Sequence, residues 1–116
     1  MKISGKVWGY TQEIIKGSSF ELHRIEVNEG GFCSLHKHIH KNNGFFVEAG
    51  GIEIEVHKND YNLVDKTVLT DGDFMIVKAG EYHRFRGLEK SVVYEIYWID
   101  DIAEDIERKE VGGTKE

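Results

Sequence analysis

The chain has 116 residues, of which 40% are hydrophobic and 31% are charged, and its formal net charge at pH 7 is -6. This length buries one modest core, so we expect a single domain over residues 1–116. Acidic and basic residues are interspersed without a basic stripe, which argues against nucleic-acid binding.

Short strands separated by turn signals follow one another along most of the chain. The expected strands cover residues 20–28, 32–38, 45–50, 51–57, 62–69, 74–78, 82–86 and 91–99. In residues 51–57 the apolar Ile52, Ile54 and Val56 alternate with polar residues, which is typical of a strand with one buried face. This series of strands predicts an all-β sandwich or barrel with room inside for one small ligand.

Only the C-terminal end has a helical pattern. Apolar residues recur there at helical spacing, and a glycine pair then ends the run: Ile99, Ile102, Ala103, Ile106, Gly112 and Gly113. A short C-terminal helix is therefore expected after the last strand.

Three histidines, His36, His38 and His40, occupy alternate positions of one expected strand. Alternation places the three imidazoles on one face of the strand. Neutral imidazole is the commonest side-chain metal ligand, so the pattern is typical of a metal site. Cys33 has the opposite parity to His36, and this argues against a ligand role for its thiol. The histidine His23 is expected to be a surface or hydrogen-bonded residue without a catalytic role.

The cysteine count and the N-terminal stretch bear on the compartment. Cys33 is the only cysteine, so an intrachain disulfide is excluded and a reducing compartment is favoured. The stretch MKISGKVWGY lacks the apolar core of a signal peptide, and no run approaches the ~20 apolar residues of a membrane helix. We therefore expect a cytoplasmic protein that does not enter a membrane.

Two spaced motifs resemble those of the cupin superfamily. The first motif consists of Gly30, His36, His38, Asn43 and Gly50, and Asn43 stands where cupins usually have a glutamate. The second motif consists of Gly72, Lys78, Ala79, Gly80 and His83, with Lys78 in place of the usual proline. The resemblance implies a small single-domain jelly-roll barrel, or double-stranded β-helix.

Roughly residues 6–113 resemble the C-terminal cupin domain of type II mannose-6-phosphate isomerases. The matching stretches are KVWGY, HRIEVNEGG, SLHKHIHK, AGEYHRFRG and YEIYWIDDIAEDIERKEVGG. In that family a glutamine, a histidine, a glutamate and a second histidine hold the metal, and these map onto His36, His38, Asn43 and His83. The resemblance therefore implies a divalent ion (zinc, iron, nickel or manganese). His40 is a candidate fourth nitrogen donor in the same pocket because it shares the parity of His36 and His38, although the matching histidine of the isomerases is not a usual ligand.

The isomerase resemblance also implies a reaction, in which a proton moves between adjacent carbons of a phosphorylated sugar. Such a reaction needs a metal, a base and a cationic group for the phosphate. Arg84, which follows His83, is the candidate catalytic residue for the cationic role. Phe45 shares the parity of Asn43 and is expected to shape the substrate pocket, whereas Glu48 is expected to face outward. The pattern identifies no general base.

Two other functions are compatible with the same residues. One is a three-histidine Fe(II) dioxygenase of the thiol-dioxygenase type, because cupins of that type bind iron through three histidines and no carboxylate. A non-catalytic cupin would bind a carbohydrate or small anion without turning it over. Cupins often pair across a sheet edge, so the resemblance also implies a homodimer.

Overall fold

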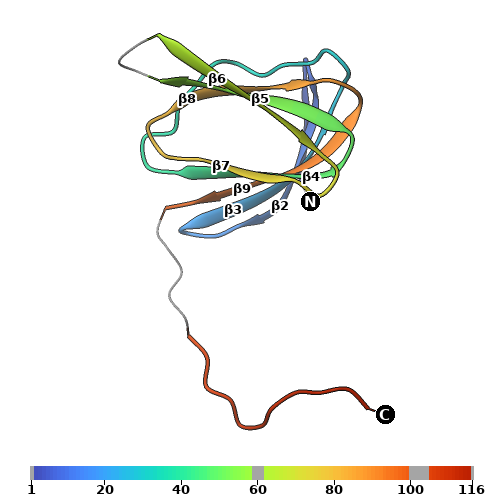
Figure 1. The fold of residues 1–116 in the computed structure, drawn as a ribbon, viewed down its shortest axis with the longest axis vertical. Coiled ribbons are helices and arrows are strands. Elements are labelled where there is room, and N and C mark those ends of the chain that lie inside the picture. The colour runs from blue at the N-terminus through green and yellow to red at the C-terminus, as the bar shows by residue number, and fades with distance from the viewer. Residues whose placement is uncertain (1, 59–61, 100–104, 116) are drawn as a thin grey trace.

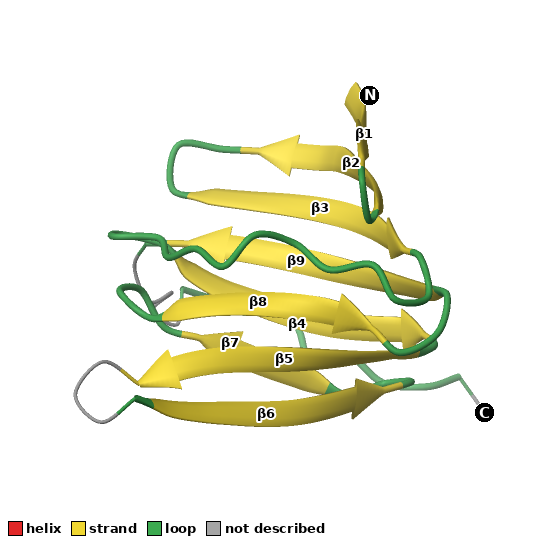
Figure 2. Cartoon of the chain, turned by 90° about the horizontal axis from the view of Figure 1, so that it is seen from above, coloured by secondary structure: helices red, strands yellow, loops and turns green. Residues whose placement is uncertain are grey.

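The computed structural model describes residues 2–58, 62–99 and 105–115 (Figures 1 and 2). Within these residues nine strands are present: β1 (Lys2–Lys6), β2 (Gly9–Lys16), β3 (Phe20–Val27), β4 (Asn42–Ala49), β5 (Gly51–Lys58), β6 (Leu63–Thr70), β7 (Phe74–Val77), β8 (Tyr82–Gly87) and β9 (Ser91–Trp98). The expected strands are found apart from the stretch at 32–38, and the structure adds β1 and β2 at the N-terminus.

The strands form two antiparallel sheets that face each other (Figure 1). The larger sheet has the order β1-β2-β3-β9-β4-β7, and the smaller has the order β6-β5-β8. The irregular segment between β3 and β4 runs along the free edge of β8 (Figure 2), joined to it by bridges at Phe32–Arg86 and His36–His83. The architecture confirms the expected all-β jelly roll.

The core lies between the two sheets and follows from the alternation of each strand. On β5 the side chains of Ile52, Ile54 and Val56 are buried, as the pattern predicts. Phe45 and Val47 on β4 and Val93 on β9 are buried on the facing sheet. Because alternate residues of the same strands point inward, the polar residues among them are carried into the interior as well.

The expected C-terminal helix is wrong for the part of the tail that the structure describes. Ile102, Ala103 and the rest of residues 100–104 lie outside the described residues, and residues 105–115 contain no helical turn. Ile106 and Val111 are 58% and 90% exposed, so the apolar side chains have no core to pack against. An isolated helix of this length is marginal in water without such packing. No helix able to cross a membrane occurs among the described residues.

Candidate metal centre

Three imidazoles from two distant parts of the chain meet inside the barrel. His36 and His38 come from the irregular segment beside β8, and His83 comes from β8 itself. Their candidate ligand atoms all lie within 4.8 Å of one another. The two segments are held in register because the His36 amide donates to the His83 carbonyl at 3.0 Å and the His83 amide donates back at 2.8 Å. The backbone bridge therefore brings three of the four predicted ligands together.

The hydrogen bonds of two of these histidines determine which nitrogen is free. Nδ1 of His36 lies 2.8 Å from the Ser34 carbonyl oxygen, and Nδ1 of His83 lies 2.9 Å from the Glu81 carbonyl oxygen. A carbonyl oxygen only accepts, so each Nδ1 carries the proton and donates it. Nε2 of each ring is left with its lone pair available. Metal-binding histidines are oriented in this way, through the nitrogen that does not bind the ion.

His38 supplies the third nitrogen. Its Nε2 atom is buried and has no hydrogen-bond partner. Burial and, secondarily, the neighbouring His36 and His83 imidazoles lower the pKa of His38 to about 4, so the ring is neutral at pH 7. A buried polar atom without a partner costs free energy, and an ion bound at Nε2 would remove that cost. The donor set fits a divalent ion that accepts nitrogen ligands, such as zinc, iron or nickel.

Asn43, the predicted amide ligand on β4, is buried next to His83. Its Oδ1 atom lies 3.2 Å from His83 Nε2. Because Nε2 presents a lone pair and Oδ1 can only accept, these two atoms have no proton to share. Two acceptor atoms come this close when both bind the same cation. If each ligand atom lies about 2.1 Å from the ion, two neighbouring ligand atoms lie about 3.0–3.4 Å from each other. The position of Asn43 is therefore compatible with the predicted ligand role.

Glu95 on β9 is the principal residue of the site to which the sequence pattern, although it places this carboxylate on a strand of the barrel, assigns no role. It pairs in register with Phe45 and is only 7% exposed. Its carboxyl group accepts a hydrogen bond from the Tyr97 hydroxyl and another from Asn43. Burial raises the pKa of Glu95, and the Tyr97 hydrogen bond opposes part of that effect. A carboxyl group that binds protons more readily than usual thus lies beside the three imidazoles.

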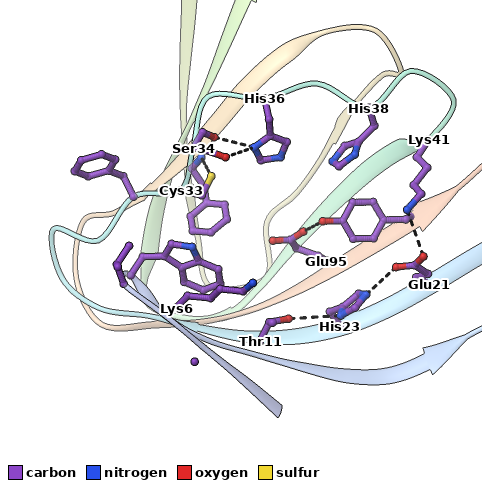
Figure 3. Close-up of a pocket in the computed structure, with 16 residues that line it drawn as sticks. Lys6, Thr11, Glu21, His23, Cys33, Ser34, His36, His38, Lys41 and Glu95 are labelled. Carbon is purple, nitrogen blue, oxygen red and sulfur yellow. Dashed lines mark hydrogen bonds and ion pairs between the residues drawn. The ribbon is translucent and has the colours of Figure 1, made fainter. Parts of the chain in front are cut away.

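His36, His38 and Glu95 border one cavity of about 680 Å³, a volume suited to a small-molecule ligand, whereas His83 and Asn43 are not among its lining residues. Figure 3 shows the Glu95 carboxyl group pointing into the cavity, with His36 and His38 on the opposite wall. Phe45 lies beneath the site, its ring centroid 6.2 Å from that of His83. It supports the metal centre from the core and is not part of the cavity lining.

Arg84 and His40, which were also predicted for the site, lie away from both the ligand group and the cavity. Arg84 has the opposite parity to His83 on β8, and its guanidinium carbon lies 5.4 Å from the ring centroid of Phe32. His40 is exposed, because the chain bends at residues 39–40 and the alternation that aligned it with His38 ends there. Neither Arg84 nor His40 lines the cavity formed by the described residues. The expected catalytic role of Arg84 and pocket role of His40 are therefore not supported by this geometry.

Cys33 faces the cavity although its parity relative to His36 predicts the opposite. The Cys33 amide donates to the Phe85 carbonyl at 3.2 Å, and the His36 amide donates to the His83 carbonyl at 3.0 Å. The three steps from Cys33 to His36 are therefore opposite the two steps from Phe85 to His83. The extra residue is a one-residue bulge, and it allows the Cys33 and His36 side chains both to point inward. Cys33 does not join the ligand group, and its Sγ atom accepts a hydrogen bond from the Phe85 amide at 3.3 Å.

We expect Cys33 to be unreactive despite lining the cavity. Burial raises the pKa of the Cys33 thiol to about 11, and the thiolate is the reactive form. At pH 8 iodoacetamide should therefore alkylate the folded protein at least about 100-fold more slowly than the unfolded protein, in which the pKa is about 8.5. Because the folded pKa is the higher one, the contribution of the protonated thiol to the unfolding free energy is fully present below the unfolded pKa and is lost as the pH rises to the folded pKa. The unfolding free energy should fall between about pH 9 and pH 11 in the wild type and fall less in Cys33→Ala. Equal alkylation rates in the two states would contradict the assignment.

The family follows from a match to the sequence model of the cupin domain, which covers residues 13–100. The chain is a cupin. None of the curated proteins compared with this cupin matches it in sequence.

Solved structures of low sequence identity share the fold of this cupin. KdgF from Halomonas sp. has a TM-score of 0.73 and 16% identity, over 87% of this chain and 90% of that chain. The cupin domain of Schizosaccharomyces pombe Cnp3 has a TM-score of 0.71 and 18% identity, over 86% of this chain and 69% of that chain. Bacillus subtilis oxalate decarboxylase, a protein with Mn(II) centres, has a TM-score of 0.70 and 14% identity, over 82% of this chain and 26% of that chain. At these identities the likeness concerns the fold alone.

Proposed function

We propose that this cupin is a metal-dependent enzyme that moves a proton between adjacent carbons of a small hydroxycarbonyl compound, the reaction type of a sugar isomerase. One observation carries the proposal: the buried Glu95 carboxyl group shares a cavity with His36 and His38, and the candidate ligand atoms of these two histidines lie within 4.8 Å of that of His83. The sequence resemblance to type II mannose-6-phosphate isomerases points to the same reaction type. Glu95 supplies the base that the sequence pattern did not identify.

In this proposal His36, His38 and His83 hold a divalent ion, with the Asn43 amide oxygen as the fourth protein donor. The ion would polarise the carbonyl oxygen of the substrate. Because all four protein donors are neutral, they leave the charge of the ion uncompensated, and the site therefore favours electron-rich oxygen ligands.

Glu95 acts as the proton carrier. Its carboxylate takes the proton from the carbon next to the carbonyl; the C–H electron pair forms the carbon–carbon double bond of an enediolate, and the carbonyl electron pair moves onto the carbonyl oxygen. The hydroxyl proton passes to that oxygen, the neighbouring oxygen becomes the new carbonyl, and the carboxylic acid returns the carbon-derived proton to the former carbonyl carbon, so atoms and electrons balance without an oxidant. The pKa of Glu95, raised by burial, brings this base closer to neutral pH, where a general base is most effective. The Tyr97 hydrogen bond orients the carboxyl group.

One observation favours a second candidate, a three-histidine Fe(II) dioxygenase. Among the described residues, the group of potential ligands contains three histidines and no carboxylate. Such a site leaves positions open for a substrate and oxygen. Glu95 has no evident role in that reaction, and this is why proton transfer is preferred. Consumption of oxygen with cysteine as the thiol substrate would favour the dioxygenase.

Exposed apolar side chains support the expected homodimer. Phe46 and Phe74 are paired across β4 and β7, and Ile76 lies on the same strand as Phe74. All three side chains are more than one third exposed on the larger sheet. A second copy of the chain would cover this apolar surface.

Hydrogen exchange at carbon tests the proposed reaction. Protein loaded separately with zinc, manganese or iron is incubated in D₂O with mannose, fructose and their 6-phosphates, and deuterium next to the carbonyl is followed by NMR. We expect incorporation with at least one metal, and its loss when EDTA removes the ion. If no sugar incorporates deuterium at saturating metal, the proposed function is wrong, and the chain is then a binding protein or a dioxygenase.

A further inference from the structure

We infer that one wall of the cavity binds the hydroxyl groups of an unphosphorylated, polyhydroxylated substrate. This hydroxyl wall consists of Thr11, Glu21, His23 and Lys41. The inference rests on the proposed function for the carbonyl end of the substrate, which would lie at the three histidines. It adds the class of molecule that the rest of the cavity accepts.

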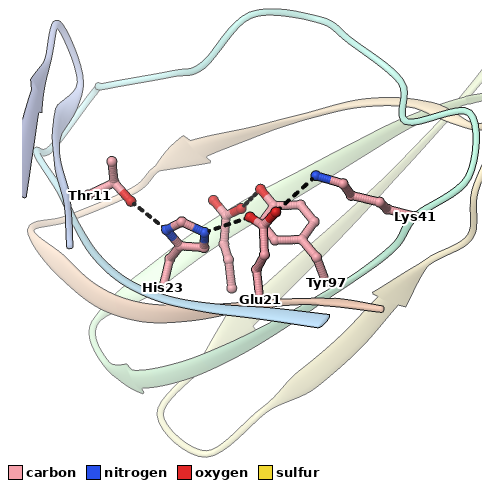
Figure 4. Close-up of polar contacts among 6 residues, drawn as sticks. Thr11, Glu21, His23, Lys41 and Tyr97 are labelled. Carbon is pink, nitrogen blue, oxygen red and sulfur yellow. Dashed lines mark hydrogen bonds and ion pairs between the residues drawn. The ribbon is translucent and has the colours of Figure 1, made fainter. Parts of the chain in front are cut away.

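The hydroxyl wall is a continuous chain of polar contacts on β2, β3 and the segment before β4 (Figure 4). His23 Nε2 lies 3.0 Å from one carboxylate oxygen of Glu21, and Lys41 Nζ lies 3.3 Å from the other. Thr11 Oγ1 lies 3.5 Å from His23 Nδ1. Glu21 and His23 point inward because they share the parity of the buried Ile25.

The direction of each hydrogen bond follows from the chemistry of the partners. The Glu21 carboxylate only accepts, so His23 Nε2 donates to it, and the Thr11 hydroxyl then donates to His23 Nδ1. The His23 hydrogen bond and, secondarily, Lys41 hold the pKa of Glu21 below its usual range, so the carboxylate is ionised at pH 7. The ammonium group of Lys41 retains N–H donors, and the Glu21 carboxylate retains lone pairs.

Donors and acceptors therefore stand side by side on the hydroxyl wall. A sugar hydroxyl group donates one hydrogen bond and accepts others, so two neighbouring hydroxyl groups satisfy both Lys41 and Glu21. A phosphate group accepts hydrogen bonds but donates few or none at pH 7. It would meet the like charge of Glu21, and the attraction of Lys41 is already shared with that carboxylate. Within the hydroxyl wall itself the charges thus favour hydroxyl groups over phosphate, and Lys6 is a further cation that lines the cavity outside this wall.

Tyr97 places the hydroxyl wall within reach of the metal centre. Its ring centroid lies 5.2 Å from that of His38 and 5.7 Å from that of His23. Both imidazoles thus contact one aromatic ring, and both line the same cavity. In this inference a five- or six-carbon chain extends from His36 and His38 past the Glu95 carboxyl group to the wall, since all of these residues line the same cavity.

Calorimetric titration of zinc-loaded protein with D-fructose and with D-fructose 6-phosphate tests this assignment. The variants are Glu21→Gln and Lys41→Met, each of which removes one charge from the hydroxyl wall. Glu26→Gln is the matched control for the first, because Glu26 pairs with Arg24 on the other face of β3. Lys37→Met is the control for the second, because Lys37 packs over Tyr82 outside the cavity lining. Zinc affinity is measured for every protein by competition with a chelating dye.

We expect fructose to bind the wild type, and each wall variant to bind it about tenfold more weakly, the usual cost of losing a hydrogen bond to a charged group. Both controls should match the wild type, zinc affinity should be unchanged in all variants, and fructose 6-phosphate should bind no more tightly than fructose. The inference is overturned if zinc binds but fructose does not, if the wall variants bind fructose like the wild type, or if the phosphate ester binds at least about tenfold more tightly. Failure of the wild type to bind any of zinc, manganese and iron would instead overturn the proposed function.

Discussion

Replacement of His38 with alanine is expected to lower the zinc affinity of this cupin by at least about 100-fold, because even residues that only orient metal ligands are worth about 10- to 100-fold. His38 Nε2 is buried, unpartnered and close to the ligand atoms of His36 and His83. Without zinc, loss of this polar atom should not lower the unfolding free energy of the variant below that of the wild type, because the substitution removes an unsatisfied buried group. The measurement is zinc affinity by dye competition, together with thermal unfolding with and without zinc.

His40→Ala is the matched control, because His40 lies two residues further on and is exposed. It should bind zinc like the wild type. At a free zinc concentration 100 times the dissociation constant, the wild type and His40→Ala should gain about 2.7 kcal/mol of unfolding free energy, whereas His38→Ala should gain almost none. Equal zinc stabilisation of both variants would show that the ion binds elsewhere.

Replacement of Glu95 with glutamine is expected to lower the rate of deuterium incorporation by about 10²- to 10⁴-fold, the usual contribution of a general acid–base group. Glutamine retains the shape of the side chain and an oxygen that can accept from Tyr97. Zinc affinity should change little, because Glu95 is outside the three-histidine ligand group. The measurement is the NMR exchange rate with the metal and sugar that give the fastest wild-type exchange.

Glu48→Gln is the control for the base, since Glu48 lies on the neighbouring strand β4 and is exposed. Its exchange rate should equal that of the wild type. If Glu95→Gln exchanged deuterium at the wild-type rate while it retained zinc, the base would have to be another group, and the proposed mechanism would be wrong.

Strands in which polar and apolar residues alternate were predicted correctly, because the apolar face must be the buried one. Ile52, Ile54 and Val56 are such a case. The pairing of His36 and His38 with His83 was available from motif spacing, although the residues are far apart in the chain. Chain spacing could not predict the bulge before His36, because the bulge depends on how the segment pairs with β8. The bulge is why parity misplaced Cys33.

Glu95 was given no role because the alternation of residues 91–98, SVVYEIYW, favours the wrong face: Ser91 and Glu95 lie at the more polar parity, yet this parity is the buried one. Only the pairing of β9 with β4 identifies the inward set, in which Ser91, Val93 and Glu95 are buried. His23 carried a usable signal, since it shares the parity of Ile25 and Val27, which are buried. That parity pointed to a cavity wall rather than to the surface. The helical spacing at the C-terminus failed because the apolar residues of the described tail find no surface to cover.

Asn43 has a more definite meaning in the structure than in the sequence. The glutamate usual at this position of cupins would place a carboxylate among the ligands, and here the neighbouring strand supplies one as Glu95. Asn43 connects the two groups, because its oxygen faces His83 and its amide contacts Glu95. Compared with a cupin that has the usual glutamate, this chain therefore has its carboxylate outside the ligand group, at Glu95, where it can accept a proton.

The most direct test of this account is an anomalous difference map from crystals of zinc-loaded protein, collected above and below the zinc absorption edge. The account predicts one strong peak inside the barrel, about 2.0–2.1 Å from Nε2 of His36, His38 and His83 and within ligand distance of Asn43 Oδ1. Absence of a peak at these three histidines in crystals shown to contain zinc would contradict it.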